Sequence, residues 1–196
     1  MFSNKDLRKL IIPLVIEQLL AVTIGMADTV MVSSCGEAAV SGISLVDSIN
    51  FLLITLFSSL ATGGAVIASQ YIGRGDHKSA SLAAKQLFYA SLALSAVLGV
   101  IAVFFRKPVL NMVFGSIEAD VMAHAQIYFL LSAISYPFLA VYNAGAALFR
   151  SMGDSRTTML ISILMNTINI VGNAILIYGF QMAAAGAATA SLVSRA

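Results

Sequence analysis

The sequence has little charge, one cysteine and no tryptophan. Of its 196 residues, 10% are charged and 59% are hydrophobic, and the mean hydropathy is +0.92. Soluble domains carry about 25% charged residues, so this composition excludes an ordinary soluble fold and indicates a polytopic membrane protein. The single Cys35 excludes an intramolecular disulfide framework, and no Cys/His cluster has the spacing of a zinc site. Without tryptophan, tyrosine must supply any aromatic anchor at the membrane interface.

Motifs of catalysis and nucleotide binding are also missing. The sequence contains no GxSxG, HExxH, Walker A or GxGxxG motif. We therefore expect a protein that is not an enzyme and that needs no cofactor. Basic residues occur in short clusters between apolar runs, which is typical of membrane topology signals and not of a nucleic-acid surface.

Long apolar runs fill most of the chain and predict an all-α integral membrane protein. A helix needs about 20 apolar residues to cross a bilayer. Five runs reach this length and a sixth begins near residue 184, so we expect a six-helix transmembrane lobe whose last helix is incomplete and a chain that is a fragment of a longer protein. The expected parts are a polar arm over 1–9, a transmembrane lobe over 10–196, and spans near 10–32, 46–71, 81–105, 120–149, 158–180 and 184–196.

Two loops with similar sequences separate the second span from the third and the fourth from the fifth. Gly75-Asp76 and Gly153-Asp154 each predict a glycine that ends one helix and an aspartate that caps the next. Shared turn chemistry and duplication of a hairpin both explain the similarity.

The distribution of lysine and arginine predicts the orientation in the membrane. Eight of these residues lie in the N-terminal arm and around the loops after the second and fourth spans, whereas only Arg106 and Lys107 lie on the opposite side. By the positive-inside rule, we expect a multi-pass protein of the cell membrane with its N-terminus in the cytoplasm.

The first span carries two acidic residues, Glu17 and Asp28. They are eleven positions apart, so they lie on nearly the same helix face, about 16 Å apart along the axis. An acid at membrane depth costs roughly 2.5 kcal/mol or more, and such residues usually mark a transport path or face a partner. Two other interpretations stay open: Asp28 can snorkel toward the outer surface, and Glu17 can form a structural pair with a hydroxyl group.

A stripe of polar residues follows one face of the fifth span. Ser162, Asn166, Asn169 and Asn173 are spaced i, i+4, i+7 and i+11. Unpaired amides are costly in hydrocarbon, so the asparagines either join neighbouring helices by hydrogen bonds or supply oxygen ligands to a cation beside Asp28. One carboxylate with amide oxygens suits a hard cation such as sodium.

Polar residues in the second and fourth spans are weaker candidates. Thr62 lies among small residues that permit close helix packing, with cavity lining as the alternative. In the fourth span, Pro137 is flanked by Tyr136 and followed by Asn143. Proline bends a helix, so Pro137 is either a hinge or part of a shaped cavity wall.

Two further charged residues lie at the expected ends of spans. Asp47 lies near the start of the second span, in an amphipathic segment, 38–48, that leads into it, and we expect water at the membrane interface to solvate it. Arg195 lies about a dozen residues into the last helix, and we expect its side chain to snorkel.

Several stretches, taken together and in order, resemble the N-terminal part of transporters of the multidrug and toxic compound extrusion (MATE) family. The similarity runs from about residue 10 to 195. The stretches that carry it are Pro13 with Glu17-Gln18, residues 26–32 (MADTVMV), residues 61–64 (ATGG) and 69–73 (SQYIG), Tyr136-Pro137 with Asn143, residues 148–154 (LFRSMGD), residues 166–173, and residues 186–190 (GAATA).

The resemblance implies a fold and an activity that composition does not show. Members of the family have twelve spans in two six-helix lobes, and they export amphipathic, often cationic compounds in exchange for sodium or protons. The resemblance makes Asp28, Asn169 and Asn173 the cation-coupling residues and places sodium among the candidate ions. One branch of the family has an aspartate where this chain has Asn173, which leaves sodium and proton coupling both open.

The expected function is therefore secondary antiport by alternating access. The expected partners are the lipid bilayer, a small organic substrate and a C-terminal lobe of the same protein. One alternative is a flippase for lipid-linked oligosaccharides, which shares the broad architecture and would have rows of Arg and Lys along its cavity. The other is a membrane module that does not transport.

Overall fold

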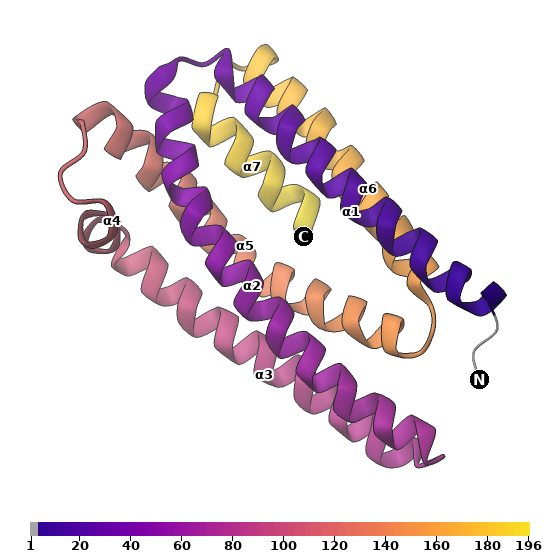
Figure 1. Cartoon of the computed structure of the whole chain (residues 1–196). Coiled ribbons are helices and arrows are strands. Elements are labelled where there is room, and N and C mark those ends of the chain that lie inside the picture. The colour runs from indigo at the N-terminus through magenta and orange to yellow at the C-terminus, as the bar shows by residue number, and fades with distance from the viewer. Residues whose placement is uncertain (1–3) are drawn as a thin grey trace.

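The computed structural model describes the chain from residue 4 to residue 196, except for the side chains of residues 4–7, 9, 21, 24, 25, 27 and 28. The described chain is helical throughout, with short connections (Figure 1). The elements are α1 (Asn4–Ser33), α2 (Glu37–Gly73), α3 (His77–Phe104), α4 (Arg106–Phe114), α5 (Ala119–Ser151), α6 (Ser155–Asn173), the π-helical turn η1 (Ala174–Gly179) and α7 (Ala183–Arg195).

Four helices among the described residues are long and apolar enough to cross a membrane. They are α2, α3, α5 and α6 together with η1. The expectation of six spans is thus confirmed for four of them. In α1 the described apolar stretch is the shorter Leu10–Leu20, and α7 has 13 residues, too few for a span of about 20.

The helix boundaries differ from the sequence-based ones at two places. α1 begins at Asn4, so part of the expected polar arm is helical. α2 has 37 residues and includes segment 38–48, which hydropathy had separated from the second span. A helix of this length is about 55 Å long and exceeds the roughly 30 Å of a bilayer core. Asp47 therefore lies well inside α2 and not at its end.

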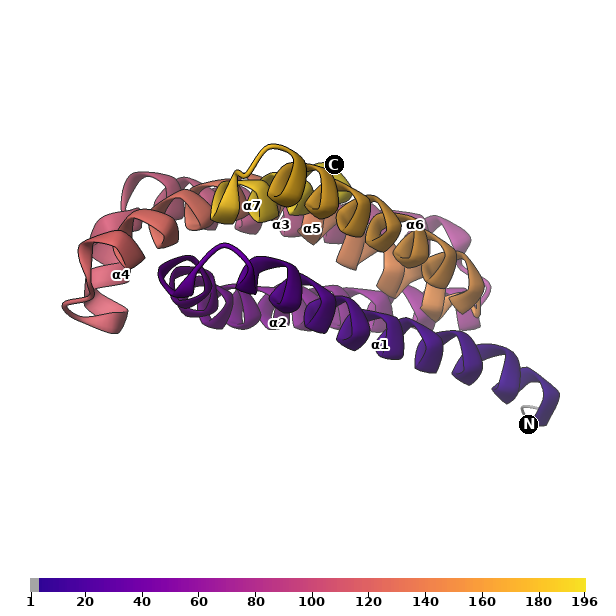
Figure 2. The same ribbon diagram turned by 90° about the horizontal axis from the view of Figure 1, so that it is seen from above.

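The helices form two groups joined by α5 and α7. α2 and α5 share the most extensive contact, with α3 against both, while α1 packs on α6 and α7 packs on both α5 and α6. Figure 2 shows α1 and α2 in one layer and α6 and α7 in the layer above them. The N-terminus and the α2–α3 and α5–α6 turns lie at one end of the bundle, opposite α4 (Figure 1).

The two glycine–aspartate turns have the geometry that the sequence predicted. Gly75 and Gly153 have positive φ angles of 74° and 87°, in the region that favours glycine. Asp76 caps α3 by accepting the N–H of Ser79 at 3.0 Å, and Asp154 caps α6 by accepting the N–H of Thr157 at 3.1 Å. Ser79 donates to Asp76, and Thr157 donates to Asp154, through the side-chain hydroxyl and the backbone N–H. These hydrogen bonds lower the pKa of both carboxyl groups.

α5 passes through Pro137 without interruption. The proline leaves the carbonyl of Ala133 without its usual helical donor. Gly99 of α3 lies close to this carbonyl: a Cβ atom at Gly99 would be 3.1 Å from the Ala133 oxygen. Pro137 thus belongs to a closely packed wall between α3 and α5, and its role as a hinge stays a prediction.

Candidate functional site

The asparagine stripe of α6 divides into two hydrogen-bonded pairs. Asn166 donates to Ser162 Oγ at 3.2 Å, within α6. Asn173 donates to Asn169 Oδ1 at 3.2 Å, and Asn169 donates to Ser191 Oγ of α7 at 3.1 Å. Asn169 therefore joins two helices, as one interpretation of the stripe predicted. Sequence reasoning missed Ser191, because nothing in the sequence of α7 marks it as a partner of α6.

Asn173 lies at the point where the α-helix gives way to η1. It is the last residue of α6 and is 1% exposed, while Asn169 is 7% exposed. π-helical turns widen a helix locally and often occur at functional sites. The helix changes type directly after Asn173, and the sequence carries no signal for this change.

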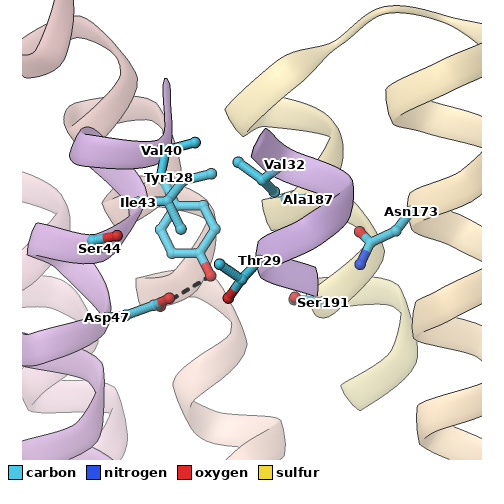
Figure 3. Close-up of a pocket in the computed structure, with 10 residues that line it drawn as sticks. All are labelled: Thr29, Val32, Val40, Ile43, Ser44, Asp47, Tyr128, Asn173, Ala187 and Ser191. Carbon is cyan, nitrogen blue, oxygen red and sulfur yellow. Dashed lines mark hydrogen bonds between the residues drawn. The ribbon is translucent and has the colours of Figure 1, made fainter. Parts of the chain in front are cut away.

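A cavity of about 100 Å³ lies where α1, α2, α5, α6 and α7 meet (Figure 3). This volume exceeds the roughly 10–15 Å³ that a single water molecule needs, so the cavity has room for several water molecules or for a small charged group of a ligand. Its lining combines hydroxyl, amide and carboxylate groups with aliphatic walls. The lining residues are Thr29, Val32, Val40, Ile43, Ser44, Asp47, Tyr128, Asn173, Ala187 and Ser191.

The turn of α1 that carries Asp28 borders this cavity through Thr29. The side chain of Asp28 lies outside the described residues, so its expected position beside Asn169 and Asn173 stays a prediction. In the part of the chain whose side chains are described, no three His, Cys, Asp or Glu residues form a group suited to a metal ion.

Asp47 of α2 lines this cavity and is exposed in this lobe, and its solvation at the membrane interface stays a prediction. Its Oδ1 accepts a hydrogen bond from Tyr128 at 3.0 Å (Figure 3). It also accepts one from Asn50 at 3.3 Å. Asn50 also donates to Ser132 at 3.3 Å and accepts the hydroxyl of Tyr136 at 2.9 Å. Hydropathy began the second span near residue 46, whereas α2 begins at Glu37, so Asp47 lies within the helix.

This polar network between α2 and α5 continues to α7. Arg195 donates through Nη1 to Ser135 Oγ at 2.9 Å, and it interacts electrostatically with Asp47 and Tyr136. Tyr136 is 1% exposed and Ser135 is fully buried. Arg195 is therefore directed into the bundle, where snorkelling had been expected.

Glu17 belongs to a different site near the N-terminal end of the bundle. Its Oε1 accepts Arg150 Nη2 at 2.7 Å and Tyr142 at 3.3 Å, and its Oε2 accepts Thr158 at 3.5 Å. The side chain of Glu17 is 9% exposed and that of Arg150 is 35% exposed. These contacts tie α1 to α5 and α6, which supports the structural interpretation of Glu17.

Two other candidates lie away from the cavity. Thr62 donates to the carbonyl of Ser58 at 2.8 Å and lines a separate groove with Arg150. Asn143 donates to the carbonyl of Leu139 at 3.0 Å, within its own helix. Among the candidates with described side chains, the structure thus joins Asn169 and Asn173, and the Tyr136 network borders the same cavity through Asp47.

The comparison with known proteins identifies the family. The MatE family model matches residues 13–175. The "Uncharacterized transporter YisQ" of Bacillus subtilis is 29% identical over an alignment of 188 positions that covers 93% of this chain and 41% of YisQ. A "Probable multidrug resistance protein NorM" of Thermotoga maritima is 30% identical over an alignment of 201 positions that covers 98% of this chain and 42% of NorM.

The fold comparison agrees. A MATE transporter of the MOP superfamily in an outward-facing conformation superposes with a TM-score of 0.91 and 24% identity, over 97% of this chain and 42% of that one. The chain thus spans about two-fifths of the length of these relatives. Since the family model matches most of the chain, the resemblance seen in the sequence is confirmed: the chain belongs to the MATE family of membrane transporters.

Proposed function

We propose that the chain forms the N-terminal six-helix lobe of a twelve-helix, two-lobe MATE antiporter. The antiporter exports amphipathic or cationic organic compounds in exchange for sodium or protons. The observation that carries this proposal is the cavity at which the Asn173 end of α6, Ser191, the Thr29 turn of α1 and Asp47 meet. A polar cavity inside an apolar helix bundle is the arrangement that a transport site needs.

In the proposed mechanism, a cation binds between Asp28, Asn169 and Asn173. The two asparagines are held together by their mutual hydrogen bond and by Ser191, so their side-chain oxygens are pre-positioned for a hard cation. Binding of the cation favours one facing of the transporter, and binding of the substrate favours the other. Antiport requires this difference in affinity between the two states.

The orientation in the cell membrane is part of the proposal. Arg74, Arg150 and Arg156 lie at the end of the bundle that holds the N-terminus, while Arg106 and Lys107 lie in α4 at the other end (Figure 1). The positive-inside rule then places the N-terminus in the cytoplasm.

The cavity lining favours export of cations over the flippase alternative. Of the residues described as lining it, one is acidic and none is Lys or Arg. A pyrophosphate-linked sugar would need basic residues there, because buried negative charge requires a partner.

The test is dye efflux from cells that express the intact reading frame, with and without a sodium gradient. Asp28→Asn should abolish export while the protein still inserts, and Glu37→Gln, which removes an acid at the exposed start of α2, should export normally. The sodium dependence identifies the ion. Unchanged export by Asp28→Asn would refute the coupling role, and no efflux by the wild type would favour the module that does not transport.

A further inference from the structure

The Asp47 carboxylate has one oxygen that is open to a ligand. Tyr128 and Asn50 both donate to Oδ1. No described residue donates to Oδ2, and Asp47 forms no ion pair with a described Lys or Arg. Asp47 is exposed in this lobe and lines the cavity.

The charge of Asp47 is only partly compensated by its neighbours. Its two hydrogen-bond donors, Tyr128 and Asn50, are neutral, and the nearby Arg195 donates its hydrogen bond to Ser135. A carboxylate at membrane depth is costly unless it is paired or reaches a water-filled path. A cation in the cavity would supply the missing partner.

The size and walls of the cavity limit which cation fits. Pockets for drug-sized ligands have about 300–1,000 Å³, whereas this cavity has about 100 Å³. It can therefore hold a charged head group but not a whole drug. Val32, Val40, Ile43 and Ala187 give it aliphatic walls, and the ring of Tyr128 lies beside Asp47 (Figure 3). Apolar walls, an aromatic ring and one carboxylate suit an alkylated ammonium group.

The geometry points to Asp47 as the counter-ion for the alkylammonium head of an organic cation, with Tyr128 and Asn50 as positioning residues. This inference rests on the proposed function and adds a second acid to it, on α2, distinct from the coupling acid Asp28 on α1. Asp47 then determines specificity for charge: the head group is selected at Oδ2, and the rest of the substrate extends beyond the cavity.

The test is equilibrium binding of radiolabelled benzyltrimethylammonium, whose charge is permanent, to the full-length transporter in lipid nanodiscs. Asp47→Asn keeps the size of the side chain and should weaken binding at least about tenfold, which corresponds to about 1.4 kcal/mol. Glu37→Gln removes an acid from the same helix outside the cavity and should bind like the wild type. Tyr128→Phe keeps the ring, loses the bond to Oδ1 and should have an intermediate effect.

A second variant distinguishes electrostatics from loss of structure. Arg195→Gln removes the positive charge near Asp47 and should strengthen binding, because the repulsion of the ligand falls. If the substitution merely loosened the fold, ligand binding would become weaker. Equal affinity in the wild type and Asp47→Asn, no binding by the wild type, or weaker binding in Arg195→Gln would overturn the inference.

The two proposals fail in different ways. Binding that depends on Asp47 in a protein without ion-driven efflux would refute the proposed antiport and leave this site in place. Ion-driven efflux with binding that ignores Asp47 would leave the antiport in place and refute this site.

Discussion

Removal of the Glu17 charge should destabilise the bundle through Arg150. Glu17→Gln keeps the size of the side chain, but it replaces one of the two accepting oxygens with an NH2 group and removes the negative charge that pairs with the Arg150 guanidinium at 2.7 Å. Breaking a buried ion pair by removing one partner costs about 3–5 kcal/mol. The Arg150 side chain is 35% exposed and keeps part of its solvation, so we expect about 2–3 kcal/mol.

The assay is thermal unfolding of the full-length protein in nanodiscs, where this loss should lower the midpoint by several degrees. Arg150→Gln should also destabilise, and the double variant Glu17→Gln/Arg150→Gln should lose at least about 1 kcal/mol less than the sum of the two, because contacting residues are coupled. Arg74→Gln removes an exposed arginine at the same end of the bundle and should change stability by no more than about 0.5 kcal/mol. Additive losses, or a wild-type midpoint for Glu17→Gln, would show that the pair does not hold α1 to α5.

Two further predictions concern packing and capping. Gly42→Ala should cost about 1–3 kcal/mol in unfolding free energy, because the new Cβ would stand 2.9 Å from the backbone N of Ala125 on α5. Gly63→Ala is the matched control. A Cβ there would have no atom within 4 Å, so this variant should be neutral or stabilising. The lowered pKa of Asp154 means that its cap stabilises α6 fully above the unfolded pKa of about 3.9 and loses this effect as the pH falls through the lower folded pKa. The difference in unfolding midpoint between the wild type and Asp154→Ala should therefore shrink on acidification below about pH 4, and a difference that is independent of pH would contradict the ionised cap.

The features that the sequence predicted correctly are those set by composition or by near neighbours along the chain. The membrane class follows from the summed hydropathy of long runs. The caps at Asp76 and Asp154 depend on residues three positions away, so their pattern is visible in the sequence. The ordered motifs that resemble the MATE family were also sufficient to identify it.

The sequence predicted the boundaries of the spans less accurately than their existence, because hydropathy is averaged over a window of residues. It separated segment 38–48 from the second span, although both belong to the continuous helix α2. Helix termini that are only moderately apolar leave no sharp signal, and α2, which packs against α5, begins before its most apolar part.

Only the tertiary structure decided which polar groups meet. Glu17 and Arg150 are 133 positions apart, and Asp47 and Tyr128 are 81 apart. Periodicity tells which residues share one helix face, and it correctly grouped the polar residues of α6. It does not tell which helix that face contacts, because this depends on the order of the helices around the bundle. For that reason the sequence alone counted Arg150 as a loop charge and left Ser191 unnoticed, while the packing of α1, α5, α6 and α7 gave both residues their partners.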